Sequence, residues 1–140
     1  MPRVRLFLDT NVLVSAVLFG GVPGRIVEAV RDGRVEGVVS LHVLAEFAEV
    51  LARPRFGFDE ATAVALAEEI ASFTDVIPLT STSGSWVTDR DDDPVVAAAL
   101  LGHVTHLVTG DVRIHEAVIE GVVVALPAEA VRLCEGTETG

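Results

Sequence analysis

The sequence has 140 residues, a formal net charge of −11 and an apolar content of 50%, which predict one folded domain and exclude a wholly disordered chain. All ten basic residues are arginine, which excludes a lysine-dependent phosphate-binding loop and an enzyme that forms a lysine Schiff base. The acidic balance also disfavours a general nucleic-acid binder, whose affinity comes from neutralising phosphates with basic side chains.

The first predicted strand is Val4–Leu8, a short apolar run rich in strand-forming residues. It ends at Asp9, the first of three residues typical of helix N-caps, and a helix is expected over residues 12–18. Residues 19–24 (FGGVPG) are predicted to interrupt this helix. The helical pattern resumes over residues 25–32, so the N-terminal region reads as a strand followed by two helices.

The rest of the chain continues to alternate between strands and helices. A second strand is predicted over residues 35–40, and Ser40 is expected to cap a helix that runs to about Arg53, just before Pro54. The remaining predicted elements are a helix at 60–73, a strand at 76–77, a helix at 94–101, a strand at 106–108, a helix at 114–119, a strand at 122–125 and a helix at 127–133.

This alternation predicts an α/β fold with a central, mostly parallel sheet that is covered by helices on both faces. We expect one domain over residues 1–134 and a flexible tail over residues 135–140, which are small and polar. Ligands of such sheets bind beyond the carboxyl ends of the strands, so the residues directly after each strand are the first candidates for a functional site.

The sequence also predicts the cellular environment. No apolar run reaches the length of about 18–20 residues that a membrane span needs, and the N-terminus shows no apolar signal segment. Cys134 is the only cysteine, so no disulfide framework is expected. We therefore expect a cytoplasmic protein with no membrane contact.

Four acidic residues stand where such a sheet would place a site. Asp9 and Asp111 each follow a predicted strand, and Asp92 lies in the loop that leads into the helix at 94–101. Glu46 lies at the margin of the apolar stripe of its helix, where an unpaired charge is costly. Each has an ordinary alternative: a helix cap for Asp9, a turn for Asp111, a solvated loop for Asp92 and an arginine salt bridge for Glu46.

Carboxylates that converge on one cleft repel one another unless some stay protonated or a divalent cation holds them together. Carboxylate oxygens suit Mg²⁺ or Mn²⁺. A metal-bound water becomes a usable nucleophile near neutral pH while the metal polarises a phosphoryl oxygen. The implied reaction is hydrolysis of a phosphodiester.

Three segments in this order resemble the PIN-domain family: "RLFLDTNVLVSAVL", "VSLHVLAEFAEVLARPRF" and "DDDPVVAAALLGHVTHLVTGD". The resemblance extends over residues 3–133 and is strongest to the VapC-related toxins of bacterial toxin–antitoxin pairs. It implies a three-layer α/β/α fold. It also implies a Mg²⁺- or Mn²⁺-dependent endoribonuclease that leaves a 5′-phosphate and a 3′-hydroxyl.

The resemblance assigns the same four acids as catalytic residues and metal ligands: Asp9, Glu46, Asp92 and Asp111. In this family the third acid stands seven residues before an Ala and nineteen before the last acid. Counting back from Asp111 therefore selects Asp92, with Asp93 as its main rival.

The resemblance further implies that Asn11, Ser15 and Thr109 orient the carboxylates. Relatives often carry another acid two positions after the fourth, but here Arg113 stands in its place. This difference leaves the number of metal ions open, and Arg113 is a candidate for contact with a substrate phosphate. Arg53, at the end of its helix, is a second candidate for that contact or an ordinary surface residue.

The expected partners are RNA, a second copy of the chain and an antitoxin protein, because relatives in this family usually dimerise and the toxins bind antitoxins. Two alternatives remain open. The fold could serve only as a non-catalytic binding module. The segment "FLDTN" also resembles the nucleophile strand of haloacid-dehalogenase phosphatases, but that family has an Asp at the position of Asn11 and needs a lysine.

Overall fold

A computed structural model describes residues 3–78, 94–111 and 121–135 of the chain. The strands form one five-stranded sheet in the order β3-β2-β1-β4-β5, and all neighbouring strands are parallel. The strands are β1 (Arg5–Leu8), β2 (Glu36–Ser40), β3 (Asp75–Ile77), β4 (His106–Val108) and β5 (Val123–Ala125). The helices are α1 (Thr10–Phe19), α2 (Gly21–Arg31), α3 (Leu41–Leu51), α4 (Glu60–Ser72), α5 (Pro94–Leu101) and α7 (Pro127–Glu135).

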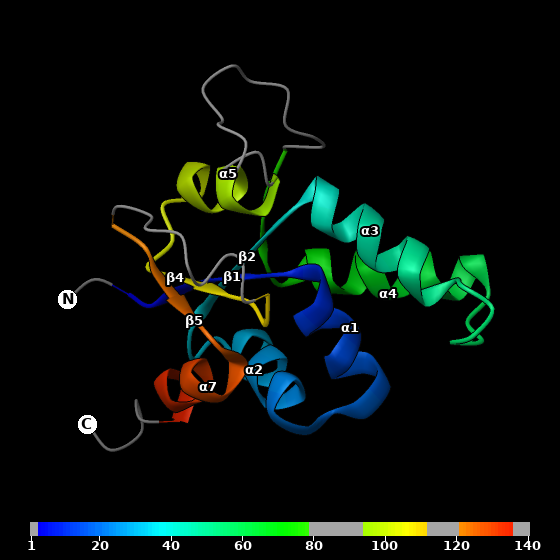
Figure 1. Ribbon diagram of the computed structural model, residues 1–140, viewed down its shortest axis with the longest axis horizontal. Helices are drawn as coiled ribbons and strands as arrows, with labels where there is room; N and C mark the ends of the chain where they lie inside the picture. Colours follow the sequence, from blue (N-terminus) through cyan, green and yellow to red (C-terminus); the bar gives the residue numbers. More distant parts are fainter. Residues whose placement is uncertain (1–2, 79–93, 112–120, 136–140) are drawn as a thin grey trace.

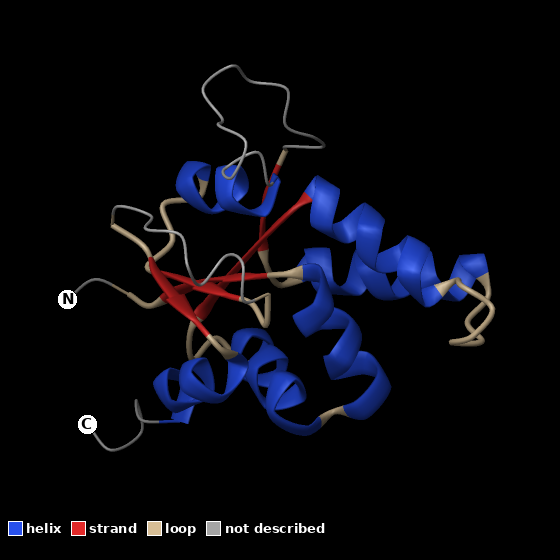
Figure 2. Cartoon of the chain, viewed as in Figure 1, coloured by secondary structure: helices blue, strands red, loops and turns tan. Residues whose placement is uncertain are grey.

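The sheet lies between two layers of helices, with α5 on one side and α2 with α7 on the other (Figure 1). Helices α3 and α4 pack against each other, and α3 runs away from the sheet (Figure 2). The predicted three-layer α/β/α fold with a parallel sheet is therefore confirmed. Because both faces are covered, the central strand β1 can be apolar after its first residue, Arg5, and Leu6, Phe7 and Leu8 are all fully buried.

The break between the first two helices is shorter than the sequence pattern predicts. Only Gly20 separates α1 from α2, and its positive φ of 70° is a conformation that favours glycine. Pro23 lies in the first turn of α2, where a missing backbone N–H costs nothing. The prediction that residues 19–24 are non-helical was therefore wrong except at Gly20.

The outer strands β3 and β5 and the last helix, α7, lie within two residues of their predicted bounds. Helix α7 extends to Glu135, so the first residue of the predicted tail is helical. Residues 136–140 and the helix predicted at 114–119 lie outside the described residues. No single helix in the described ranges is long and apolar enough to cross a membrane. Helices α1 and α2 together have that length and composition, but the pair is bent by 104° at the break between them.

The amino ends of the strands carry an ion-pair network around Arg5. Arg5 donates to Glu36 (Nη1 to Oε1, 2.9 Å) and to Asp75 (Nη2 to Oδ2, 3.0 Å), which are the first residues of β2 and β3. It also donates to the carbonyl oxygen of Gly102 at 2.7 Å. Burial opposes the charged form of Arg5, but the hydrogen bonds to Asp75 and Glu36 outweigh it and raise its pKa. Arg3 Nε also lies 3.2 Å from Glu36 Oε2, so two arginines and two acids balance one another at this edge of the sheet.

His106, the first residue of β4, should make stability depend on pH. Its side chain is half-buried, and burial lowers the pKa of His106 below its ordinary value of 6.5. The unfolded chain therefore binds a proton more readily than the fold does, so stability is present above about pH 6.5 and is lost as the pH falls through the folded pKa. We expect His106→Gln to flatten the decrease in melting temperature between pH 7.5 and about pH 5.5. A variant that keeps the wild-type slope over this range would contradict the assignment.

Candidate active site

The carboxyl ends of the strands, opposite the Arg5 network, form an edge of the sheet that carries acidic and hydroxyl side chains. Asp9 directly follows β1, Thr109 and Asp111 follow β4, and α3 begins directly after β2. These three strands are neighbours in the sheet. Because the strands are parallel, their carboxyl ends bring the residues that follow them to one edge.

Asp9 is held by hydrogen bonds to both of its carboxylate oxygens. Its backbone N–H donates to the carbonyl oxygen of Val108 at 3.2 Å, which continues the pairing of β1 with β4. Oδ1 accepts from the backbone N–H of Thr10 at 2.7 Å, and Oδ2 accepts from the hydroxyl of Thr109 at 2.6 Å. Asp9 is only 8% exposed and Thr109 is fully buried. Both donors are neutral, so these hydrogen bonds orient the carboxylate without cancelling its charge.

Glu46 reaches the same edge from α3. Ser40 caps this helix, because its hydroxyl accepts from the backbone N–H of Val43 at 3.1 Å. Glu46 Oε1 then accepts a hydrogen bond of 2.6 Å from the hydroxyl of Thr10. The Glu46 side chain is 44% exposed, and His42 Nε2 lies 3.9 Å from the same Oε1 atom. Glu46 is therefore held at one oxygen while the side chain remains in contact with solvent.

Asp111 completes the connected set. Its backbone N–H donates to the Thr109 hydroxyl at 3.0 Å, and that hydroxyl in turn donates to Asp9. Asp9, Glu46 and Asp111 thus belong to one hydrogen-bonded chain that passes through Thr10 and Thr109. Asp9 and Glu46 take part through their carboxylates, whereas Asp111 takes part through its backbone N–H. Residues from three separate segments of the sequence are joined at one edge of the sheet.

The model of the PIN domain family matches residues 5–113 of the chain. This protein belongs to the PIN-domain family. No curated protein matches the sequence. PIN domains are generally nucleases and typically use divalent metal ions, so the family gives a nuclease-type fold.

The potential metal-ligand atoms at this edge of the PIN domain are carboxylate and hydroxyl oxygens, which are the ligands that Mg²⁺ and Mn²⁺ prefer. Within residues 3–78, 94–111 and 121–135, which include Asp9, Glu46 and Asp111, no group of three His, Cys, Asp or Glu side chains is arranged to hold a metal ion. The predicted third ligand, Asp92, and its rival Asp93 lie outside the described residues. The donor chemistry fits the metal, and the ligand set stays a prediction.

The roles predicted for Asn11, Ser15, Arg53 and Arg113 find no direct support among the described contacts. Asn11 is exposed and Ser15 is partly buried, and the described part of the chain shows no hydrogen bond from either side chain to a carboxylate. Arg53 follows the carboxyl end of α3, the end that is farther from the sheet (Figure 1). Its Nη2 atom lies 3.3 Å from Glu49 Oε1. Arg113 lies outside the described residues. The roles proposed for these four residues stay predictions.

Sequence reasoning missed Thr10, which it treated only as part of a helix cap. The signal available in the sequence was its position directly after Asp9 at the end of a predicted strand. The structure shows that Thr10 is only 4% exposed. A buried hydroxyl needs a hydrogen-bond partner, but the sequence alone does not reveal that the partner is Glu46.

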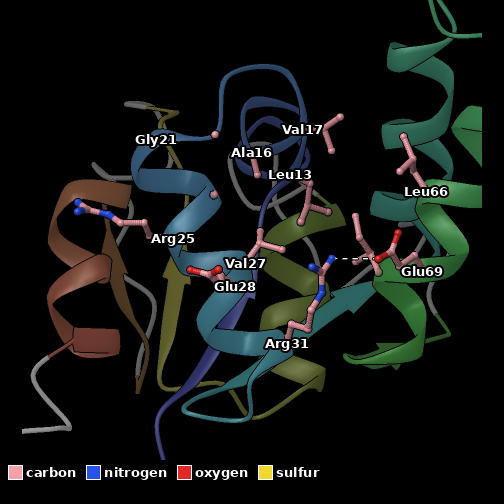
Figure 3. Close-up of a pocket in the computed structure, with 13 residues that line it drawn as sticks. Leu13, Ala16, Val17, Gly21, Arg25, Val27, Glu28, Arg31, Leu66 and Glu69 are labelled. Carbon is pink, nitrogen blue, oxygen red and sulfur yellow. Dashed lines mark hydrogen bonds and ion pairs between the residues drawn. The ribbon is translucent and has the colours of Figure 1, made fainter.

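A separate pocket of about 440 Å³ lies between α1, α2 and α4 (Figure 3). Its walls include Leu13, Val27 and Leu66, and the ion pair between Arg31 and Glu69 crosses one side of it at 3.0 Å. Among the predicted catalytic acids that the structure describes, Asp9, Glu46 and Asp111, none lines this pocket. The candidate active site is therefore the edge of the sheet and not this pocket.

Proposed function

We propose that this PIN domain is a Mg²⁺- or Mn²⁺-dependent endoribonuclease that hydrolyses phosphodiester bonds in RNA. The observation that carries the proposal is the hydrogen-bonded chain at the carboxyl edge of the sheet, which joins the carboxylates of Asp9 and Glu46 and includes the backbone N–H of Asp111. The family supports a nuclease in general, and the specific substrate and metal are our inference.

Asp9, Glu46 and Asp111, together with Asp92, would hold the metal. When bound, such an ion supplies a polarised phosphoryl oxygen and a water of lowered pKa. The protein groups supply orientation: Thr109 and the Thr10 backbone N–H fix both oxygens of Asp9. Glu46 is in contact with solvent, so its carboxylate is the one best placed to position a water molecule or accept its proton.

Charge also supports a metal-dependent reaction. The chain has a formal net charge of −11, and an acidic surface repels the phosphates of RNA. A divalent cation at the carboxylates would offset part of their negative charge and present a positive centre where the scissile phosphate has to approach. RNA binding at this edge should therefore require the metal.

We further propose that the protein is the cytoplasmic toxin of a toxin–antitoxin pair and acts as a homodimer. This role rests on the resemblance of the motifs around Asp9, Glu46 and Asp111 to the VapC-related toxins. An antitoxin that inserts an arginine among these carboxylates would compete with the metal. Expression of the protein alone should arrest growth, and co-expression with a neighbouring antitoxin gene should restore it. Growth that is unaffected by the protein would count against the toxin role and leave the nuclease proposal standing.

The metal and Glu46 can be tested together by following cleavage of a labelled single-stranded RNA. We expect cleavage in Mg²⁺ or Mn²⁺, none in excess chelator, and recovery when the metal is added back. Glu46→Gln should reduce the rate by at least about a hundredfold, because loss of a group that only orients a ligand costs about 10–100-fold and this variant removes the charge of a proposed ligand itself.

Glu49→Gln is the matched control, because Glu49 lies on the same helix but is 69% exposed and pairs with Arg53. It should cleave RNA at the wild-type rate. Cleavage that persists in chelator, or that Glu46→Gln leaves unchanged, would contradict the proposed mechanism. A protein that binds the RNA without cutting it under any metal condition would instead be the non-catalytic module.

A further inference from the structure

Thr10 contacts two of the predicted catalytic acids through different atoms. It is the first residue of α1 and is only 4% exposed. Its backbone N–H donates to Asp9 Oδ1 at 2.7 Å, and its hydroxyl donates to Glu46 Oε1 at 2.6 Å. One residue therefore connects the acid that follows β1 with the acid on α3.

The hydrogen bond from the Thr10 hydroxyl to the Glu46 carboxylate belongs to a strong class. A hydrogen bond from a hydroxyl to an ionised carboxylate is shorter and about twice as strong as one between neutral groups, and 2.6 Å lies in its usual range. Threonine is also restricted at χ1 by its branched Cβ, so little side-chain freedom is lost when the hydroxyl is aimed at one partner.

Glu46 is the acid that most needs such a contact. Its side chain has several rotatable bonds and is 44% exposed, so the surrounding packing alone does not restrict it to one rotamer. Asp9 is different, because it is buried and Thr109 also holds it. Loss of the Thr10 hydroxyl would thus release Glu46 while leaving both hydrogen bonds to Asp9 in place.

We propose that Thr10 is a positioning residue that fixes the Glu46 carboxylate beside Asp9, so that both acids face the metal in one arrangement before it binds. This inference rests on the proposed function and assigns a role to a residue outside the predicted catalytic set. The simpler alternative is that the hydroxyl only ties α1 to α3, which would affect stability but not metal affinity.

Direct titration of the purified full chain with Mn²⁺ in the absence of RNA distinguishes the two roles. Thr10→Val and Thr10→Ala both remove the hydroxyl and keep the backbone N–H that Asp9 accepts. We expect each to weaken Mn²⁺ binding by about tenfold to a hundredfold, as loss of a group that orients a metal ligand usually does. Thr10→Ser keeps the hydroxyl and should bind Mn²⁺ within about twofold of the wild type.

Two further variants sharpen the test. Thr62→Val removes an exposed hydroxyl from the first turn of α4 and should leave the affinity for Mn²⁺ unchanged. In a Glu46→Gln background, Thr10→Val should cause little additional loss of Mn²⁺ affinity, because the residue acts through Glu46. Equal losses in the two backgrounds would overturn the inference.

The outcomes separate this inference from the proposed function. If the wild type binds Mn²⁺ and cleaves RNA while the variants without the hydroxyl bind Mn²⁺ as tightly as the wild type, the positioning role is wrong and the nuclease proposal stands. A lower melting temperature with unchanged Mn²⁺ affinity would likewise show a purely structural tie. If the wild type neither binds Mn²⁺ nor cleaves RNA, both proposals fail.

Discussion

Asp9→Asn is expected to lower the rate of RNA cleavage by at least about a hundredfold while leaving the fold intact. Loss of a residue that only orients a metal ligand lowers metal affinity or activity by about 10–100-fold. Loss of a ligand's own charge should therefore lower activity by at least the upper end of that range. Asp9 is also the residue through which Thr10 and Thr109 connect the candidate site. Its charge is therefore central to any metal-dependent mechanism at this edge.

The fold should tolerate this change because asparagine has nearly the same shape as aspartate. Its carbonyl oxygen can still accept from the Thr10 N–H and so maintain the cap of α1. The amide group would face Thr109, whose hydroxyl oxygen can accept a hydrogen bond in place of the one it donates to Asp9. The melting temperature without metal should thus stay close to that of the wild type.

Metal addition gives a second readout that needs no RNA. A metal that binds only the folded state stabilises it by about 2.7 kcal/mol when its concentration is a hundred times the dissociation constant. We expect Mn²⁺ to raise the melting temperature of the wild type and to have little effect on Asp9→Asn. Thermal unfolding with and without Mn²⁺ measures this difference directly.

Asp59→Asn is the matched control, because Asp59 is also a helix-capping aspartate. Its side chain accepts from the Thr62 N–H at 2.7 Å at the start of α4, and the hydrogen bonds from Thr62 lower the pKa of Asp59. Asparagine caps helices about as well, so this variant should keep wild-type stability and activity. Equal activity in the Asp9 and Asp59 variants would contradict the assignment of Asp9.

Much of the fold could be predicted because its signals are local. The apolar strands, the caps at Ser40 and Asp59 and the alternation of strands with helices all lie within short windows of sequence. Parallel pairing then follows from the connections, since those from β1 to β2, from β2 to β3 and from β3 to β4 each contain a helix. The error at residues 19–24 has a local cause as well: Gly and Pro are read as helix breakers, although Pro23 lies in a first turn that tolerates it.

The candidate site was less predictable because its contacts join distant segments. The positions of Asp9 and Asp111 follow from the strands that precede them. The partner of Glu46 depends on how α1 and α3 pack, which no short window specifies. The hydrogen bond from Thr10 to Glu46 spans 36 positions in the chain and therefore emerges only from the three-dimensional arrangement.

Phe47→Ala should cause the largest loss of stability among the variants considered. Phe47 is fully buried on α3 and belongs to the apolar core. Truncation of a buried phenylalanine to alanine usually costs about 3–5 kcal/mol, because contacts are lost and a cavity remains. That is a large share of the roughly 5–15 kcal/mol by which a domain is stable. Urea unfolding should show a lower midpoint with a similar slope.

Phe19→Ala is the control for the same chemical change at the surface. Phe19 ends α1 and is 80% exposed, so its truncation should alter the free energy of unfolding by no more than about 0.5 kcal/mol. Equal losses in the two variants would mean that Phe47 does not anchor α3. Because Glu46 directly precedes Phe47, the packing of this side chain also sets the direction from which Glu46 approaches Thr10. Residual Phe47→Ala protein that is still folded should therefore bind Mn²⁺ more weakly, whereas Phe19→Ala should bind it as the wild type does.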